Sequence, residues 1–264
     1  MRTIKAITND ETGLFQQVVL DGLHSIAQQP DFAVEVLTTD HVNEEPPLEK
    51  TDGVVVIANA VSNDVLSSIY QKEIPITLVS HHHPELPIPA VMSDNSQGIR
   101  TLMAHLVREC KRSKPVFIRG IPEQQDSQQR ERAFRQELLR HNISPEASRI
   151  IDGRFSPEAA VAAIHELLAE GFAFDSMIAA DYIMGIAALD TLHQAGITVP
   201  GEVSVVGYGD DRAAEEAGLT TVSANIRELG QRAARQIISQ INGLHISGTT
   251  TINVELIIRD SCGC

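Results

Sequence analysis

The chain has 264 residues, of which 42% are hydrophobic and none is tryptophan, and it carries a net charge of −14. This length is enough for one large α/β domain or for two lobes of roughly 130 residues each. The acidic balance argues against binding of a phosphate backbone, which needs a lysine- and arginine-rich surface. No apolar run approaches the ~20 residues that span a bilayer. The first residues do not resemble a secretory signal, so we expect a cytoplasmic protein without a membrane partner.

The first part of the chain alternates short apolar strands with helical stripes. We predict strands over 3–8, 33–37, 54–57 and 76–79, a helical stripe over 15–27 and a helix over 63–71. This order implies a parallel sheet with right-handed crossovers. A further helix is expected to begin within 92–95 and to bury a face that extends to Cys110. Asp94 or Asn95 is its expected N-cap, and for Asp94 ligand contact is an equal alternative.

The segment 81–89, with sequence HHHPELPIP, interrupts the alternation. Its three prolines exclude a helix or an interior strand. Adjacent histidines converge on one metal ion less easily than histidines four residues apart on a helix. His81, at the end of a strand, is therefore expected to hydrogen-bond a polar ligand rather than to bind zinc.

A second series of strands and helices follows. Strands are predicted over 115–118, 149–151, 177–180, 203–206, 219–222 and 252–258, and helices over 127–140, from Ser156, over 183–196 and over 226–241. The last of these helices has the clearest amphipathic pattern. About ten strands in two series favour two lobes over a single wide sheet.

The strand at 203–206 ends in Gly207-Tyr208-Gly209, followed by the carboxylates of Asp210 and Asp211. Open α/β sheets hold ligands outside the carboxyl ends of their strands, so this corner is a candidate site. Solvated turn residues are the alternative. A hydrolase that uses Asp210 or Asp181 as a general base is a third possibility, without a nucleophile or second acid at a supporting spacing. No dinucleotide fingerprint, phosphate loop or nucleophile elbow is present, so no cofactor is predicted.

Three cysteines, Cys110, Cys262 and Cys264, fit a reducing compartment. The motif Cys262-Gly263-Cys264 suggests a metal or redox site, but no second cysteine pair accompanies it. An inert pair is the favoured interpretation, and no metal site is predicted.

Several motifs, in one order, resemble those of the lactose-repressor (LacI/GalR) family. The segment 94–98 is similar to its D-N-x-x-G, and Ser127 with Arg130 and Phe134 is similar to its S-x-x-R-x-x-G-F. The segment 196–208, GITVPGEVSVVGY, resembles A-G-x-x-V-P-x-D-V-S-V-V-G-F/Y. The segments 219–222 and 228–230 look like L-T-T-V and E-x-G, and 254–261 looks like the closing E-L-x-x-R-x-S. The resemblance covers nearly the whole chain and is most specific over 196–230.

This resemblance implies a type I periplasmic-binding-protein-like fold: two Rossmann-like α/β lobes with parallel sheets, joined by three crossings. The implied N-terminal lobe is 1–111 plus 225–245, and the C-terminal lobe is 112–224 plus 246–264. It also implies a homodimer that binds a small effector, a sugar or related metabolite, between its lobes and changes hinge state on binding. In the family, operator DNA is read by an N-terminal helix-turn-helix, which is absent before residue 3. A sensor module of a histidine kinase or similar composite regulator, which resembles this chain in its S-C-G-C-like end, and a transport-type solute-binding protein are the alternatives.

Carried over by position, the ligand-binding residues would be Phe15, Asn59, His81, Asp94, Asp126, Arg130, Asp181, Tyr182 and Asp210. Arg130 has the best chemical case, because a guanidinium offers five fixed donors, although a surface helix arginine is the alternative. Two positions depart from the family pattern. Asp181-Tyr182 stands where the family has N-D, and Gly209 stands where it has a ligand-binding aspartate. Either Asp210 takes that role from one position later, or the site binds a different ligand.

Overall fold

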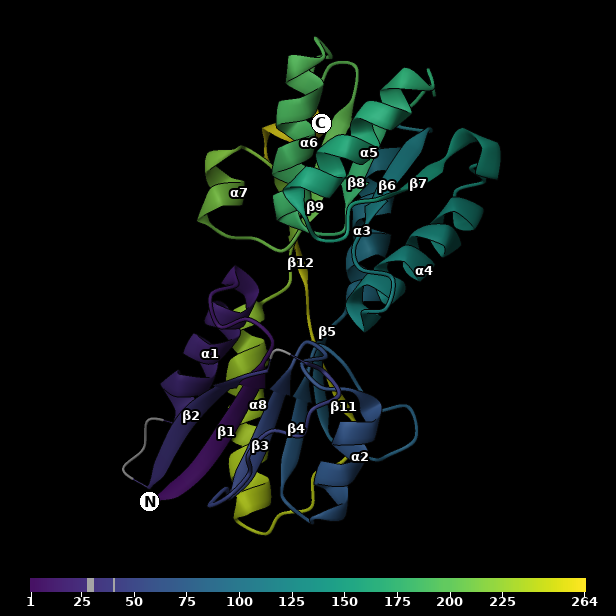
Figure 1. Ribbon diagram of the computed structural model, residues 1–264. Helices are drawn as coiled ribbons and strands as arrows, with labels where there is room; N and C mark the ends of the chain where they lie inside the picture. Colours follow the sequence, from purple (N-terminus) through teal and green to yellow (C-terminus); the bar gives the residue numbers. More distant parts are fainter. Residues whose placement is uncertain (28–30, 40) are drawn as a thin grey trace. The chain divides into compact units, whose positions relative to one another are not determined.

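The structure, a computed structural model, describes residues 1–27, 31–39 and 41–264, and the chain divides into two compact units (Figure 1). Unit 1 contains Met1–Ser93 and Asn225–Asn253, and unit 2 contains Asp94–Ala224 and Val254–Cys264. The chain therefore passes between the units three times, as the resemblance implies. None of the helices in the described ranges is long and apolar enough to cross a membrane.

Unit 1 is a six-stranded parallel sheet with helices on both faces. Its strand order is β11-β5-β4-β3-β1-β2, and every pairing is parallel. Its elements are β1 (Arg2–Thr8), α1 (Leu14–Ala27), β2 (Phe32–Thr38), β3 (Gly53–Ile57), α2 (Asn63–Gln71), β4 (Ile76–Val79), β5 (Ala90–Ser93), α8 (Ile226–Ile241) and β11 (Thr249–Ile252).

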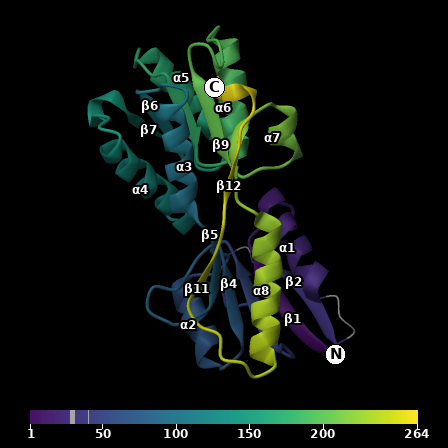
Figure 2. The same ribbon diagram turned by 180° about the vertical axis from the view of Figure 1, so that it is seen from behind.

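The apolar residues of β3 show how this sheet is covered on both faces. Val55 and Ile57 pack with α1 and α8 in one core cluster, whereas Val54 and Val56 pack with α2 in another. Successive side chains of a strand point to opposite faces, so an uninterrupted apolar run is what a doubly covered strand requires. Figure 2 shows α8 lying across one face beside α1, while α2 covers the other face.

Unit 2 repeats this plan with one antiparallel edge. Its strand order is β12-β10-β9-β8-β6-β7, and only β12 runs antiparallel, to β10. Its elements are α3 (Asn95–Arg108), β6 (Pro115–Arg119), α4 (Gln125–Arg140), the 3-10 helix η1 (Pro145–Ala147), β7 (Arg149–Asp152), α5 (Pro157–Ala169), β8 (Ser176–Ala179), α6 (Tyr182–Gln194), β9 (Ser204–Tyr208), α7 (Arg212–Glu216), β10 (Thr220–Ser223), β12 (Glu255–Ile257) and the 3-10 helix η2 (Asp260–Cys262). The α/β class and the parallel sheets predicted from the sequence are confirmed.

Three elements differ from the prediction. Residues 92–93 belong to the buried strand β5 rather than to the start of a helix, because the capping residue Asp94 follows the strand directly. The single strand expected over 252–258 is two strands, β11 beside β5 in unit 1 and β12 beside β10 in unit 2. The short helix α7, capped by Asp211, was not predicted.

The division into units also differs from the lobe boundaries expected from the resemblance. Residues 94–111 lie in unit 2, because α3 packs on α4 and against the strands β9, β10 and β12. Residues 246–253 lie in unit 1, because β11 completes the edge of its sheet beside β5. Both differences follow from the location of α3 and the division of the last strand.

Two glycines allow α1 and α8 to pack backbone against backbone in unit 1. A Cβ at Gly230 would lie 2.0 Å from the carbonyl oxygen of Val19, and a Cβ at Gly22 would lie 2.2 Å from that of Arg227. Neither carbonyl can move without shifting its helix. These positions therefore set the distance between the helices that cover one face of the sheet.

We expect Gly230→Ala to destabilise the protein by about 2 kcal/mol, because overpacking outweighs the ~1 kcal/mol by which alanine favours a helix over glycine. Urea unfolding followed by circular dichroism measures the difference. Arg235→Ala, at an exposed position of the same helix, is the control and should change stability by less than about 0.5 kcal/mol. A Gly230→Ala protein as stable as the wild type would show that α1 and α8 do not pack this closely.

Candidate functional site

Arg130 lies at the centre of a polar cluster in unit 2. It projects from α4 and is only 8% exposed, so it is not a surface arginine. Its Nε donates to Asn95 Oδ1 at 2.8 Å, and its Nη1 donates to the carbonyl oxygen of Ala180 at 2.8 Å. The guanidinium carbon lies 4.0 Å from the centroid of the Tyr208 ring. A buried cation needs hydrogen-bond acceptors or an aromatic face around it. Here Asn95 of α3, the carbonyl group of Ala180 after β8 and the Tyr208 ring at the end of β9 supply them.

Asn95 connects Arg130 to the acidic side of the cluster. While its amide oxygen accepts from Arg130, its Nδ2 donates to Asp126 Oδ1 at 2.7 Å and to Gln129 Oε1 at 2.9 Å. Asp126 also lies 3.6 Å from Arg130 Nη2. Every polar atom of the Asn95 amide is used, so the orientation of the neighbouring side chains is fixed before any ligand arrives.

Two predicted site residues are helix caps in this cluster. Asp94 caps α3 by accepting from the backbone N–H of Gln97 at 2.8 Å, and Asp181 caps α6 by accepting from that of Met184 at 2.8 Å. Burial raises the pKa of Asp181 to about 6, although the backbone N–H of Met184 and the Arg130 guanidinium act in the opposite direction. Asp181 therefore exchanges a proton near neutral pH at the carboxyl end of β8.

Tyr182 follows Asp181 at the first position of α6 and is buried. Burial, followed by the Asp211 carboxylate, raises the pKa of its phenol. The phenol group is consequently neutral at physiological pH, and its hydroxyl can donate or accept a hydrogen bond.

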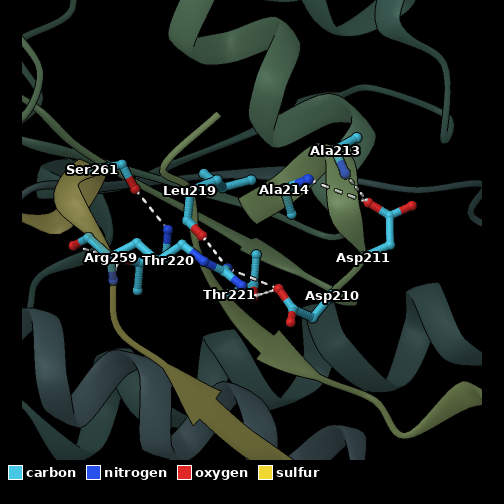
Figure 3. A network of polar contacts seen from close by, with 9 residues as sticks. All are labelled: Asp210, Asp211, Ala213, Ala214, Leu219, Thr220, Thr221, Arg259 and Ser261. Carbon is cyan, nitrogen blue, oxygen red and sulfur yellow. Dashed lines mark hydrogen bonds and ion pairs between the residues drawn. The ribbon is translucent and has the colours of Figure 1, made fainter. Parts of the chain in front are cut away.

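Asp210 and Asp211 have separate structural roles (Figure 3). Asp210 Oδ1 accepts from Thr221 Oγ1 at 2.7 Å and pairs with Arg259 Nη1 at 2.8 Å. Asp211 caps α7 through the backbone N–H groups of Ala213 and Ala214, at 2.8 and 3.2 Å. The Asp210 carboxylate holds the segment after β12 to β10, which makes it a weaker ligand candidate than Asp181.

In unit 1 the predicted residues Asn59 and His81 lie near each other at the carboxyl ends of β3 and β4. His81 is 1% exposed, and its Nδ1 lies 3.0 Å from the carbonyl oxygen of Val79 and 3.4 Å from the backbone nitrogen of Asn59. Donation from Nδ1 to Val79 leaves Nε2 as an acceptor, and this buried atom has no hydrogen-bond partner among the described residues. Burial lowers the pKa of His81 to about 4, so the ring is neutral at physiological pH.

Phe15 is the remaining predicted site residue of unit 1, and His83 follows His81 in the proline-rich segment. Phe15 lies in the first turn of α1 and packs, partly buried, against the core. His83 Nδ1 accepts from the backbone N–H groups of Glu85 and Leu86, at 3.2 and 3.0 Å, and so holds the proline-rich loop. Within the described ranges, the three adjacent histidines are not part of any group of side chains placed to hold a metal ion.

Some site residues were not found from the sequence. Asn95, Gln129 and Tyr208 lie within the motifs that resemble the family, but the sequence indicates only Asp94 and Arg130 as ligand-binding residues within those motifs. The available signal was the helical spacing of Asp126, Gln129 and Arg130, which places all three near one face of α4. Arg259, the partner of Asp210, lies 49 residues further along the chain, and no local pattern connects them.

The comparisons with known proteins agree with this architecture. The family model described as a periplasmic binding protein-like domain matches residues 103–262. The chain belongs to this family. It is 25% identical to the transcriptional repressor PurR of Photobacterium profundum, over 98% of this chain and 81% of PurR.

Solved structures of LacI-family regulators are also similar. One from Burkholderia phymatum has a TM-score of 0.83 at 28% identity and covers 99% of both chains. One from Enterococcus faecium with bound ribose has a TM-score of 0.89 at 21% identity and covers 98% of both chains. The resemblance to LacI-family regulators is confirmed, and these relatives are named as transcriptional regulators or repressors.

We expect Asp181→Asn to change how stability depends on pH. Because the folded pKa of about 6 lies above the usual value of 3.8, the folded chain holds this proton more tightly than the unfolded chain. The resulting stabilisation is complete below about pH 4 and is lost as the pH rises through 6. Asparagine can keep the cap without the charge.

The free energy of unfolding of Asp181→Asn relative to the wild type should therefore rise between pH 4 and pH 7, by on the order of 2 kcal/mol. Urea unfolding at several pH values measures it. A difference that stays constant over this range would contradict the raised pKa.

Proposed function

We propose that the chain is the effector-binding domain of a LacI-type transcriptional regulator, acts in the cytoplasm and binds a neutral sugar or a related polyhydroxy metabolite. The observation that carries the proposal is the preorganised Arg130–Asn95–Asp126 cluster beside Asp181, at the carboxyl ends of a parallel sheet. Open α/β sheets hold their ligands at this end of their strands. The net charge of −14 makes the chain itself a poor DNA-binding surface, so operator DNA would be read by another segment.

The charge of the cluster favours a neutral ligand. The Arg130 guanidinium lies near the carboxyl groups of Asp126 and Asp181. An anionic ligand would meet an excess of negative charge, whereas sugar hydroxyls can donate to carboxylates and accept from the guanidinium. This argument favours a free sugar over a sugar phosphate or a uronate.

Unit 1 also has polar groups that suit this ligand class. The buried Nε2 of His81 can accept a hydrogen bond from a hydroxyl group, and Asn59 follows the neighbouring strand. A ligand with different affinities for two conformational states of the chain would favour one of them, because only differential affinity shifts a conformational equilibrium. We propose this as the basis of a regulatory, non-catalytic switch.

We expect thermal-shift screening of the full chain against pentoses, hexoses, disaccharides, nucleosides and sugar phosphates to identify a neutral sugar. At 100 times its dissociation constant, a ligand should add about 2.7 kcal/mol of stability. Arg130→Lys keeps the charge but loses the fixed donor geometry, and should weaken binding about 10- to 100-fold by calorimetry.

The matched control is Arg135→Lys, another arginine of α4, whose side chain is 61% exposed. It should leave affinity nearly unchanged. Binding of sugar phosphates but not of neutral sugars would contradict the proposed ligand class. The absence of a shift with every compound would contradict the effector function.

We further propose that the protein forms a homodimer, because the LacI-family neighbours include a lac repressor dimer solved on its operator. A twofold assembly lets two ligand sites act on one output. Light scattering coupled to size-exclusion chromatography should give twice the 28.7 kDa chain mass at micromolar concentration. A mass of one chain under these conditions would contradict the dimer.

A further inference from the structure

A cluster of three cysteines and one histidine lies in unit 2, away from Arg130. His105 is in the last turn of α3 and Cys110 follows that helix, whereas Cys262 ends η2 and Cys264 lies two residues further on. Their ligand atoms all lie within 4.8 Å of one another. Three sulfurs and one imidazole are a donor set that soft, tetrahedral sites use for zinc.

Three distances between donor atoms of the cluster are close to the edges of a tetrahedral zinc site. His105 Nε2 lies 3.4 Å from Cys262 Sγ and 3.3 Å from Cys264 Sγ, and the two sulfurs are 3.8 Å apart. Zinc with bonds of about 2.3 Å to sulfur and about 2.0 Å to nitrogen requires edges of roughly 3.8 Å between sulfurs and roughly 3.6 Å between sulfur and nitrogen. Three of the six edges are therefore close to those of an occupied site.

The fourth donor, Cys110, is joined to Cys264 in a disulfide in the structure. The Cα atoms of this pair are 5.1 Å apart, which also allows two separate thiolates to reach a common ion. Reduction with two electrons and two protons would restore both thiols. Cys262 is a free, buried cysteine whose Sγ lies 3.4 Å from His105 Nε2, and it takes no part in the disulfide.

The backbone around Cys262 is fixed to the sheet of unit 2. Ser204 Oγ donates to the carbonyl oxygen of Cys262 at 2.6 Å, and Ser261 Oγ donates to that of Val205 at 2.6 Å. Arg112 Nε in turn donates to Ser204 Oγ at 2.8 Å. These contacts hold the donor atoms in place without using them, which is the role of the residues around a metal site.

Gly263 forms the backbone turn between Cys262 and Cys264. Its φ is +81°, in the left-handed region that disfavours residues with a side chain. A Cβ at this position would also lie 2.8 Å from the Cβ of Pro200. A glycine is thus required between Cys262 and Cys264 if both sulfurs are to approach His105.

We propose that in the reduced chain His105, Cys110, Cys262 and Cys264 bind one Zn²⁺ ion. The three thiols release their protons on binding, and the neutral imidazole binds through Nε2. All four positions are filled by protein, which is typical of a structural site and leaves none for a substrate. The ion would fasten the segment after β12 to the end of α3, across 154 residues of sequence.

The test uses the full chain purified in a phosphine reductant without chelator, with zinc measured by mass spectrometry. We expect one zinc per chain and, after replacement with Co²⁺, the visible absorption of tetrahedral thiolate-bound cobalt. His105→Ala and Cys264→Ser should each weaken zinc binding more than the roughly 10- to 100-fold caused by loss of an outer-shell partner. His165→Ala, an exposed histidine of α5, should leave it unchanged.

Circular dichroism shows whether each variant folds. If a variant does not fold, the zinc content of the wild-type chain still tests the proposal. A reduced, folded chain without zinc, or with zinc content equal in His105→Ala and wild type, would overturn the proposal. One titratable thiol per denatured chain after purification in reductant, instead of three, would also overturn it, because the Cys110–Cys264 disulfide would then be the persistent state.

Discussion

The buried guanidinium of Arg130 is the constraint on which the candidate site of unit 2 depends. A cation inside the protein is tolerated only where oxygen atoms and aromatic faces surround it. This requirement brings Asn95 from the start of α3, Asp126 from α4, the carbonyl of Ala180 after β8 and the ring of Tyr208 from the end of β9 to one place. The polar groups proposed to bind ligand are thus held in place by the need to compensate the buried charge of Arg130, which exists without ligand.

Capping and ligand binding are compatible roles for the aspartates at these strand ends. A carboxylate has two oxygens and about four acceptor positions, and a helix N-cap uses one of them. Asp94, directly after β5, and Asp181, two residues after β8, each accept a backbone N–H through one carboxylate oxygen, which leaves further acceptor positions on each carboxylate. Asp210 differs, because its Oδ1 receives both Thr221 and Arg259. Its offset from the family pattern therefore coincides with a different structural role.

Elements defined by local pattern could be predicted from the sequence, and those defined by distant partners could not. The helix α2 begins and ends where its periodicity predicts, and the family motifs locate Arg130. The strand β5 has only four residues between a proline-rich loop and a helix cap, and it exists because β4 and β11 pair with it. The same holds for the cysteine cluster, whose members are joined only when the segment after β12 returns to α3.

The interleaving of the two units has a consequence for how the chain can fold as it leaves the ribosome. The core of unit 1 needs Leu229, Ala233 and Ile237 of α8, and its sheet needs β11, but residues 94–224 are synthesised before them. Unit 2 in turn lacks an edge strand until β12 appears. Neither unit can complete its sheet until nearly the whole chain has been made, so a nascent chain carries two unfinished sheets with exposed apolar surface. Such intermediates are the ones that chaperones protect.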